Sequence, residues 1–333
     1  IRDKVVGFVS PIQIQALNQN ESIEETPFVY DTSLRSILTT YFIESVYPTA
    51  NKAGLIKTDT EIHGIILKGV DKDYNWDYIN SNLTSGKTPQ YTDKERSNDV
   101  VISKIIADKL LLNVGDEVRL WFVGEDMKTR GRKFTVKGIY ETGLTECDER
   151  FIYCDLNQIR RLNGWENDYV GHLEIQLKED INVEEANNYI YYNIPTYLIS
   201  YTARELYPHI FDWLDLQDMN VVIIIVLMLL VAGITIISML LIIVLERTST
   251  IGVLKALGAD NRFIRKVFLQ RSKRILLTGM LIGNAFGIGL CLIQKYTEII
   301  KLSPESYYLS SVPIELNLTH VILLNAGTFL LWV

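Results

Sequence analysis

The chain has 333 residues, of which 33 are Lys or Arg and 40 are Asp or Glu, so its formal net charge is −7. This length is enough for two domains or more, and the three cysteines are too few for a disulfide framework. A bridge between Cys147 and Cys154 stays open, because the sequence does not give the distance between their Cα atoms.

Residues 1–218 are predicted to form a mixed α+β domain outside the cytoplasm. Short runs rich in Val, Ile, Tyr and Phe show the partial alternation that is typical of strands. These runs are Val9–Ala16, Gly64–Gly69, Asp99–Ile102, Glu117–Val123, Lys133–Tyr140, Phe151–Cys154 and Gly171–Leu177. Helices are expected between them at Ser103–Leu111, Asp155–Leu162 and Val183–Tyr192. Turn residues interrupt the pattern at Asn113–Asp116 and Gly124–Asp126.

The segment Thr202–Asp218 is predicted to be helical and to run almost directly into the first hydrophobic run, with Pro208 as its one breaker. Such a segment would be either a stalk that carries motion between the membrane and the outer domain or a simple connector. The sequence favours neither.

Three hydrophobic runs place residues 219–333 in a membrane domain. Val221–Leu245 has 25 residues without a charge, and a helix of that length is ~37 Å long, enough to cross a hydrocarbon core of ~30 Å with some tilt. Ile275–Gln294 is a second uncharged run and Leu316–Val333 is a third. Core helices of soluble proteins rarely run so long without a charge, so we interpret these runs as membrane spans.

The distribution of charge predicts the orientation of the spans. The loop Glu246–Arg274 carries eight Lys and Arg against two acids, whereas residues 1–220 carry 23 Lys and Arg against 35 acids. Short basic loops stay in the cytoplasm, so we expect this loop, with Lys255, inside, and residues 1–220, with Lys94, and Lys295–Glu315 outside. An outer domain this large needs a further span before it, which gives four spans and places both true termini in the cytoplasm.

No catalytic or metal-binding constellation is found, so the chain is not expected to be an enzyme or to hold a cofactor. The histidines lack the spacing of a metal site, and we interpret each as a surface or packed residue; they are His63, His172, His209 and His320. The nucleotide-binding pattern G-x-x-x-x-G-K-[ST] does not occur, so the chain is not expected to bind nucleotide by that route.

Small residues follow one face of the second hydrophobic run. Gly279, Gly283 and Gly287 are spaced by four, a doubled G-x-x-x-G that lets helices approach closely in lipid. This face would pack against the other spans of the chain or serve in assembly. Asn284 lies beside it, and because an amide in hydrocarbon needs a partner, we expect its side chain to point into the helix bundle.

The cytoplasmic loop is predicted to be a short amphipathic helix pair. Ile251, Leu254 and Gly258 fall on one helical face, and Lys255 points elsewhere. The segment from Gly258 to Asp260 would end one helix and cap the next. Small residues on this loop permit close approach by another protein, whereas its basic and aromatic residues suit a membrane surface. The residues alone leave both interpretations open.

The run ERTSTIGVLKALGA, residues 246–259, resembles the signature of MacB/FtsX-type ABC-transporter permeases. In that family the signature joins the second membrane helix to a cytoplasmic coupling helix, which docks on a separate ATPase. The resemblance therefore implies a cytoplasmic ABC ATPase dimer as a partner. The residues that it implies for ATPase coupling are Glu246, Arg247, Ile251, Gly252, Leu254, Lys255, Gly258 and Ala259.

Further segments extend the resemblance over nearly the whole chain, with residues 1–218 similar to the MacB-like periplasmic domain. They are VGFVSPIQIQ at residues 6–15, LNVGDEVRL at 112–120, FTVKGIYETG at 134–143 and SYYLSSVPIELN at 306–317. The last of these is similar to the lipoprotein-releasing LolC/LolE-type branch. In that branch one permease offers a hairpin to a periplasmic lipoprotein chaperone. The matching hairpin here, Val123–Lys133, is short and has no proline, so chaperone binding stays open.

The resemblance implies a multi-pass permease subunit in the inner membrane of a Gram-negative bacterium. It would couple ATP hydrolysis in its partner to work on the outer side, above all the release of lipoproteins. An efflux or peptide-export permease and an FtsX-like regulator of an outer enzyme remain alternatives. Besides the ATPase, the expected partners are a second permease copy or paralogue and membrane lipid; no nucleic acid is expected.

Overall fold

The computed structural model describes residues 2–18, 24–57, 62–92, 96–123, 129–302, 312, 314 and 316–332. The chain divides into two compact units, the first built on residues 1–211 and the second beginning at Asp212. Each unit is described by itself below.

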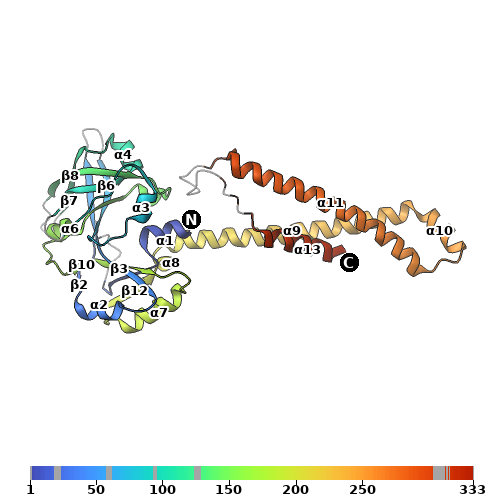
Figure 1. Ribbon diagram of the computed structural model, residues 1–333, viewed down its shortest axis with the longest axis horizontal. Helices are drawn as coiled ribbons and strands as arrows, with labels where there is room; N and C mark the ends of the chain where they lie inside the picture. The colour runs from blue at the N-terminus through green and yellow to red at the C-terminus, as the bar shows by residue number, and fades with distance from the viewer. Residues whose placement is uncertain are drawn as a thin grey trace. The chain divides into compact units, whose positions relative to one another are not determined.

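The first unit is an α+β domain around one large mixed sheet (Figure 1). The strand order is β12-β1-β11-β3-β4-β9-β6-β8-β5, with β7 paired to β3 and β8, and β10 and β2 form a separate small sheet. The strands are β1 Ile12–Ala16, β2 Phe28–Val29, β3 Ile43–Lys57, β4 Ile62–Val70, β5 Leu83–Gly86, β6 Asp99–Ser103, β7 Glu117–Val123, β8 Thr129–Tyr140, β9 Phe151–Asp155, β10 Tyr169–Val170, β11 His172–Leu177 and β12 Leu198–Thr202. The helices are α1 Arg2–Val9, α2 Thr32–Leu38, α3 Asp77–Ser81, α4 Lys104–Leu110, α5 Thr145–Asp148, α6 Leu156–Asn163, α7 Val183–Asn193 and α8 Ala203–Leu206.

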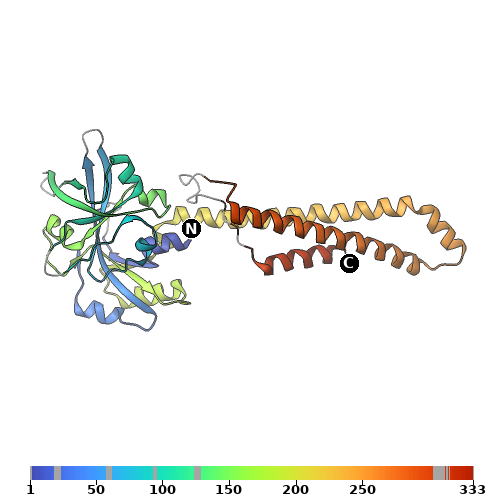
Figure 2. The same ribbon diagram turned by 45° about the horizontal axis from the view of Figure 1, so that its top comes forward.

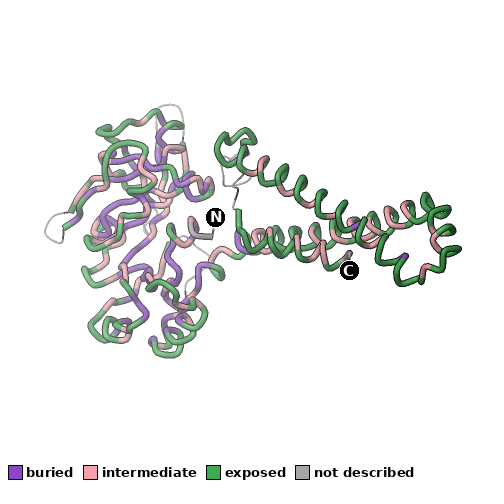
Figure 3. The backbone as a smooth tube through the Cα atoms, turned by 45° about the vertical axis from the view of Figure 1, so that its right-hand side comes forward, coloured by how far each residue is buried: buried purple, intermediate pink, exposed green. Residues whose placement is uncertain are grey.

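Strand β3 joins two hydrophobic cores. Its first half pairs with β11 and its second half with β4, and the partners change at Thr49. One core lies beneath α4 and α6, and the other lies beneath α2 and α7, which occupy the lower end of the domain in Figure 1. Figure 3 shows the buried backbone of both cores in purple. The long strand therefore makes the two halves of the domain continuous.

The helix caps follow the sequence closely. The Ser103 side chain accepts a hydrogen bond from the Ile106 amide, and Asp155 accepts one from the Asn157 amide, so both predicted N-caps are confirmed. The helix predicted over Thr202–Asp218 is wrong as one element, because α8 ends before Tyr207 and a new helix begins at Pro208. Proline has no amide proton to continue α8, but it suits the first position of a helix.

Other differences concern strands. All seven predicted strands are present, β7 with the predicted bounds and the others with shifted ends; α1 occupies Val9, and the chain turns at Ser10, with φ of 64°, before β1 begins. The longest strand, β3, was not predicted, because Pro48 and Lys52 interrupt its apolar pattern. The predicted turn at Gly124–Asp126 lies outside the described residues, as does the tip of the β7–β8 hairpin. Cys147 and Cys154 are both free and buried, so the bridge left open by the sequence is not formed.

The second unit consists of long apolar helices. These are α9 Pro208–Glu246, α10 Thr248–Ala256, α11 Asn261–Thr297 and α13 Leu318–Trp332. Among the described residues, α9 and α11 are long and apolar enough to cross a membrane, and α13 is a shorter apolar helix. Large apolar side chains along α9, such as Leu227 and Ile234, are exposed, and both α9 and α11 are green for most of their length in Figure 3. Water disfavours such a surface and lipid does not, so the surface suits a bilayer.

Candidate functional site

The loop between α9 and α11 is a short helix with a defined end. After α9 stops at Glu246, the nine residues of α10 begin past Arg247, and a left-handed glycine, Gly258, follows α10. The Gly258 amide donates to the Lys255 carbonyl and the Ala259 amide to the Leu254 carbonyl, each at 3.0 Å. This is the Schellman arrangement, in which a φ of +87° calls for glycine. The predicted end of the first helix at Gly258 is confirmed.

The next helix starts at once. The Asp260 side chain accepts a hydrogen bond from the Asn261 amide at 2.8 Å and caps α11. Thus α10 lies between Arg247 and the turn at Gly258, and Figure 2 shows it linking α9 to α11 at one end of the helical unit. A helix of this length is marginal alone in water, so its flanking helices fix where it lies.

The exposure of α10 separates two apolar faces. Ile251 and Leu254, which share the predicted helical face with Gly258, are half-buried. By contrast, Val253 is 59% exposed and Leu257 is 79% exposed. These two residues are four apart and therefore lie on one face of the helix. Their spacing is visible in the sequence, but this face was not among the predicted ones.

The other residues implied for coupling are accessible. Glu246, Arg247, Gly252, Lys255 and Gly258 are exposed, and Ala259 is partly exposed. A Cβ placed on Gly252 or Gly258 would have no described atom within 4 Å. Their part in docking an ATPase stays a prediction.

The glycine face of α11 is open. A Cβ placed on Gly279, Gly283 or Gly287 would have no described atom within 4 Å, so the described part of this chain does not fill the face. Asn284, beside it, exchanges two hydrogen bonds with Asn325 of α13, at 2.8 and 3.2 Å. The expected partner for the Asn284 amide is therefore confirmed, and it comes from another helix of the same unit.

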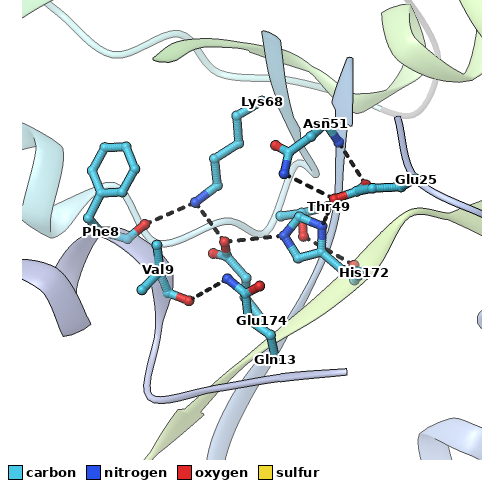
Figure 4. A network of polar contacts seen from close by, with 9 residues as sticks. All are labelled: Phe8, Val9, Gln13, Glu25, Thr49, Asn51, Lys68, His172 and Glu174. Atoms are coloured by element: carbon cyan, nitrogen blue, oxygen red, sulfur yellow. Dashed lines mark hydrogen bonds and ion pairs between the residues drawn. The ribbon is translucent and has the colours of Figure 1, made fainter. Parts of the chain in front are cut away.

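A buried polar network lies at the centre of the first unit (Figure 4). The Lys68 ammonium on β4 lies 2.6 Å from the Glu174 carboxylate on β11. His172, also on β11, lies 3.5 Å from Glu174 through Nε2 and 2.7 Å from Glu25 through Nδ1. The Glu25 carboxylate accepts hydrogen bonds from the backbone and side-chain nitrogens of Asn51 on β3. The sequence did not single out this network, because its members are distant along the chain.

The network remains charged despite its burial. Burial opposes the charged forms of Lys68 and Glu174, but their mutual attraction outweighs it, so the pKa of Lys68 is raised and that of Glu174 is lowered. Burial likewise opposes the imidazolium of His172, but Glu25 and Glu174 outweigh it and raise the pKa of His172 to about 9. Lys68, Glu174 and His172 are therefore paired in their charged forms at neutral pH.

The same network fastens the end of helix α1. Lys68 donates to the Phe8 carbonyl at 3.0 Å, and the Gln13 side chain donates to the Val9 carbonyl at 2.8 Å. These are carbonyls of the last turn of α1, which have no partner within the helix. A cation at this end also complements the helix dipole. Lys68 thus joins α1 to the junction of the two cores.

The ionisable groups of the buried network are paired with one another. Among the described residues, no group of three or more His, Cys, Asp and Glu could hold a metal ion. Burial raises the pKa of the Cys147 thiol to about 12 and that of Cys154 well above its usual value, so neither supplies a thiolate at neutral pH. The charged groups brought together are paired with one another rather than directed at a pocket.

Two family models divide the chain as the two units do. Residues 5–190 match the MacB-like periplasmic core domain, and residues 222–333 match the FtsX-like permease C-terminal domain. The chain belongs to the MacB/FtsX-type permease family. It is thus an ABC-transporter permease whose large sheet domain is of the MacB-like periplasmic type, and α9, α11 and α13 lie in its FtsX-like part.

Individual relatives of this permease are distant. LolE of Haemophilus influenzae, a lipoprotein-releasing system transmembrane protein, is 22% identical over 293 residues, which are 84% of this chain and 70% of LolE. LolC of Xylella fastidiosa is 23% identical over 245 residues, which are 68% of this chain and 58% of LolC. MacB of Bdellovibrio bacteriovorus, a macrolide export ATP-binding/permease protein, is 26% identical over 186 residues, 51% of this chain and 28% of MacB. The periplasmic region of MacB from Actinobacillus actinomycetemcomitans is a similar solved structure, with 13% identity, 60% of this chain and 91% of that chain covered, and a TM-score of 0.41.

Proposed function

We propose that this permease is the membrane subunit of an ABC complex that releases lipoproteins from the inner membrane, driven by a separate cytoplasmic ATPase. The observation that carries the proposal is the extent of the similarity to LolE, which covers 84% of the chain and so includes both units. In this proposal the chain performs no covalent chemistry, and it works beside a second permease copy or paralogue.

Helix α10 is the proposed contact with the ATPase. A Schellman turn at Gly258 ends α10 before α11 begins, and Val253 and Leu257 offer exposed apolar side chains to a protein groove. Movement of α10 would pass into α9 and α11. Helix α9 starts within the first unit, where Ile210 and Phe211 are buried, so a shift along α9 would reach the outer domain.

The proposed orientation places the basic loop in the cytoplasm and the first unit outside. Single cysteines test it, read with an impermeant thiol reagent on intact cells. Lys94 lies outside the described residues, so the exposed Lys178 is the better outer position. Lys178→Cys should react from outside, and Lys255→Cys should react only after the membrane is opened. Reaction of Lys255→Cys in intact cells would reverse the topology.

A reconstitution tests the function itself. The intact permease and its ATPase are placed in proteoliposomes with an acylated lipoprotein, and the lipoprotein that leaves the membrane is measured with and without ATP. ATP-dependent release of the acylated protein, with no release of a transmembrane control protein, is the expected result. Release that does not depend on ATP would contradict the proposal.

The similarity to MacB supports a second candidate, export of a small molecule or peptide. The same proteoliposomes distinguish it, because export would lower the retention of a trapped macrolide while leaving lipoproteins in place. An FtsX-like regulator would do neither and would instead alter the activity of an outer enzyme that co-purifies with it. Chaperone binding at the hairpin of β7 and β8 remains a proposal, tested by adding a periplasmic lipoprotein carrier to the release assay.

A further inference from the structure

The first turns of α11 carry a strongly basic face. Its residues recur every three or four positions and so lie on one side of the helix. They are Arg262, Arg265, Lys266, Leu269, Gln270 and Lys273, and they line a shallow open hollow of about 460 Å³. We call this set the basic face.

The cations of the basic face have no anionic partner in the described parts of the chain. Arg262, Arg265, Lys266 and Lys273 are all exposed, and no described carboxylate forms an ion pair with any of them. Lys273 instead lies 5.9 Å from the centre of the Phe329 ring on α13. Four unneutralised cations on one side of a helix attract an anionic ligand.

The basic face adjoins the apolar part of its helix. Ile275, two residues past Lys273, begins the uncharged run that continues to Gln294. Leu269 places an apolar side chain among the cations, as suits a surface that contacts both phosphate and acyl chain. When α11 crosses the bilayer, these residues lie at the level of the lipid headgroups.

We propose that the basic face binds the phosphate groups of anionic lipids at the cytoplasmic surface of the membrane. Basic clusters immediately beside a span have this affinity because the negative surface attracts each Lys or Arg within a Debye length. Bound lipid would set the depth of α11 in the bilayer, and with it the height of α10. The proposal goes beyond the release of lipoproteins, and it requires that α11 spans the membrane with its N-terminal end in the cytoplasm.

A lipid fits this face better than the ATPase does. The exposed apolar pair Val253 and Leu257 on α10 has the composition of a protein contact, whereas the basic face is a run of cations on the helix that itself enters the bilayer. Charge complementarity therefore favours a phosphate-bearing headgroup.

The test uses the intact permease in an uncharged detergent. The probes are dioctanoyl phosphatidylglycerol and dioctanoyl phosphatidylcholine, which share chain length and differ in net charge, and bound lipid is counted by native mass spectrometry. The wild type should retain the anionic lipid in preference to the zwitterionic one. Arg265→Gln and Lys266→Gln should each weaken retention of the anionic lipid about fivefold, and the double variant more strongly. Lys266→Arg should retain it.

A matched control lies on the same helix. Arg271 is exposed and nine residues from Arg262, which places it half a turn away at 3.6 residues per turn. Arg271→Gln removes the same charge and should leave lipid retention unchanged. Equal loss in Arg271→Gln and Lys266→Gln, or equal retention of the two lipids by the wild type, would overturn the proposal.

Two further arms separate other ligands. Inorganic phosphate at millimolar concentration should not displace the lipid; complete displacement would mean a free-phosphate site and overturn the proposal. A loss of ATPase co-purification in Arg265→Gln, with the lipid preference unchanged, would assign the face to the ATPase and also overturn it. Lipoprotein release is not measured in this experiment, so its result on lipid binding stands even if the proposed function is wrong.

Discussion

Lys68 and Glu174 form an ion pair across strand β3, with Nζ and Oε1 2.6 Å apart and neither side chain more than 3% exposed. Lys68 is on β4 and Glu174 on β11, and these strands lie on opposite sides of β3. The Lys68 ammonium also lies within 6 Å of the ring centres of Phe8, Tyr74 and Tyr153. One buried pair thus connects three strands with the end of α1.

Removing one member of this pair should cost more than removing both. Lys68→Met leaves the buried Glu174 carboxylate with only the longer contact to His172 and should lower the free energy of unfolding of the first unit by about 3–5 kcal/mol. Lys68→Met combined with Glu174→Leu should recover most of that loss. Hydrogen exchange of β4 and β11 in the intact chain measures both. Equal destabilisation by the single and double variants would show that the charge pairing contributes little.

His172 should make the first unit less stable as the pH rises. Its pKa is raised to about 9 by Glu25 and Glu174 despite burial, above the ordinary value of 6.5. A raised pKa means that the folded state holds the proton more tightly, so the stabilisation is complete below pH 6.5 and is lost as the pH rises towards 9. Unfolding of the wild type and of His172→Gln is compared at pH 6, 7.5 and 9. The difference between them should shrink across this range; a constant difference would contradict the charged imidazolium.

The open glycine face should serve contact with another chain. Because no described atom lies within 4 Å of a Cβ on Gly283, Gly283→Leu should leave the fold of the subunit intact and reduce its association with a second permease at least tenfold. Co-purification of two differently tagged copies, or of a paralogue, gives the readout. Gly289→Leu is the matched control, since Gly289 is equally open but lies about a third of a turn away. Leu290→Ile, a conservative apolar exchange, should also be neutral. If Gly283→Leu associated with a second permease as well as the wild type does, the glycine face would not form the contact between the two chains.

The exposed pair on α10 should decide ATPase docking. Leu257→Asp places a charge where an apolar contact is expected and should reduce recovery of the ATPase with the permease at least tenfold at equal expression. Gly258→Trp would also reduce recovery, but φ at this glycine is +87°, so the turn itself would be strained. Gly258→Asn tolerates that conformation and should retain docking. If ATPase recovery fell in Leu254→Asp but not in Leu257→Asp, the docking face would be the one formed by Ile251 and Leu254.

Removing one member of the amide pair Asn284 and Asn325 should cost more than replacing both. Asn284→Leu leaves the Asn325 side chain with only its hydrogen bond to the Val321 carbonyl of its own helix and should destabilise the packing of α11 on α13 by about 1 kcal/mol. The double leucine variant should be close to the wild type. Cysteines introduced at positions flanking the pair should cross-link less efficiently in the single variant than in the double. Equal cross-linking in the wild type, the single variant and the double variant would mean that Asn284 and Asn325 are not hydrogen-bonded to each other in the membrane.

Local features of the sequence carried most of the correct predictions. The caps at Ser103, Asp155 and Gly258 depend on hydrogen bonds within four or five residues, so the sequence alone specifies them. The long apolar helices could also be predicted, because a long run without charged residues is visible in the sequence itself. The break at Tyr207 also has a local cause, although one continuous helix was predicted there. Pro208 disfavours a helical conformation at the residue before it.

What the sequence by itself determined is therefore the class of the protein: a sheet domain, long uncharged hydrophobic runs and a loop of the MacB/FtsX type, because each of these is specified within a short segment. Only the tertiary structure decided which charges meet. Lys68 and Glu174 are far apart along the chain, and their contact exists because β3, itself unpredicted, lies between β4 and β11. Likewise, the spacing in α10 offered two apolar faces, and only the fold of the neighbouring helices left Val253 and Leu257 exposed. Strand order and side-chain exposure depend on contacts between distant segments, which no local pattern encodes.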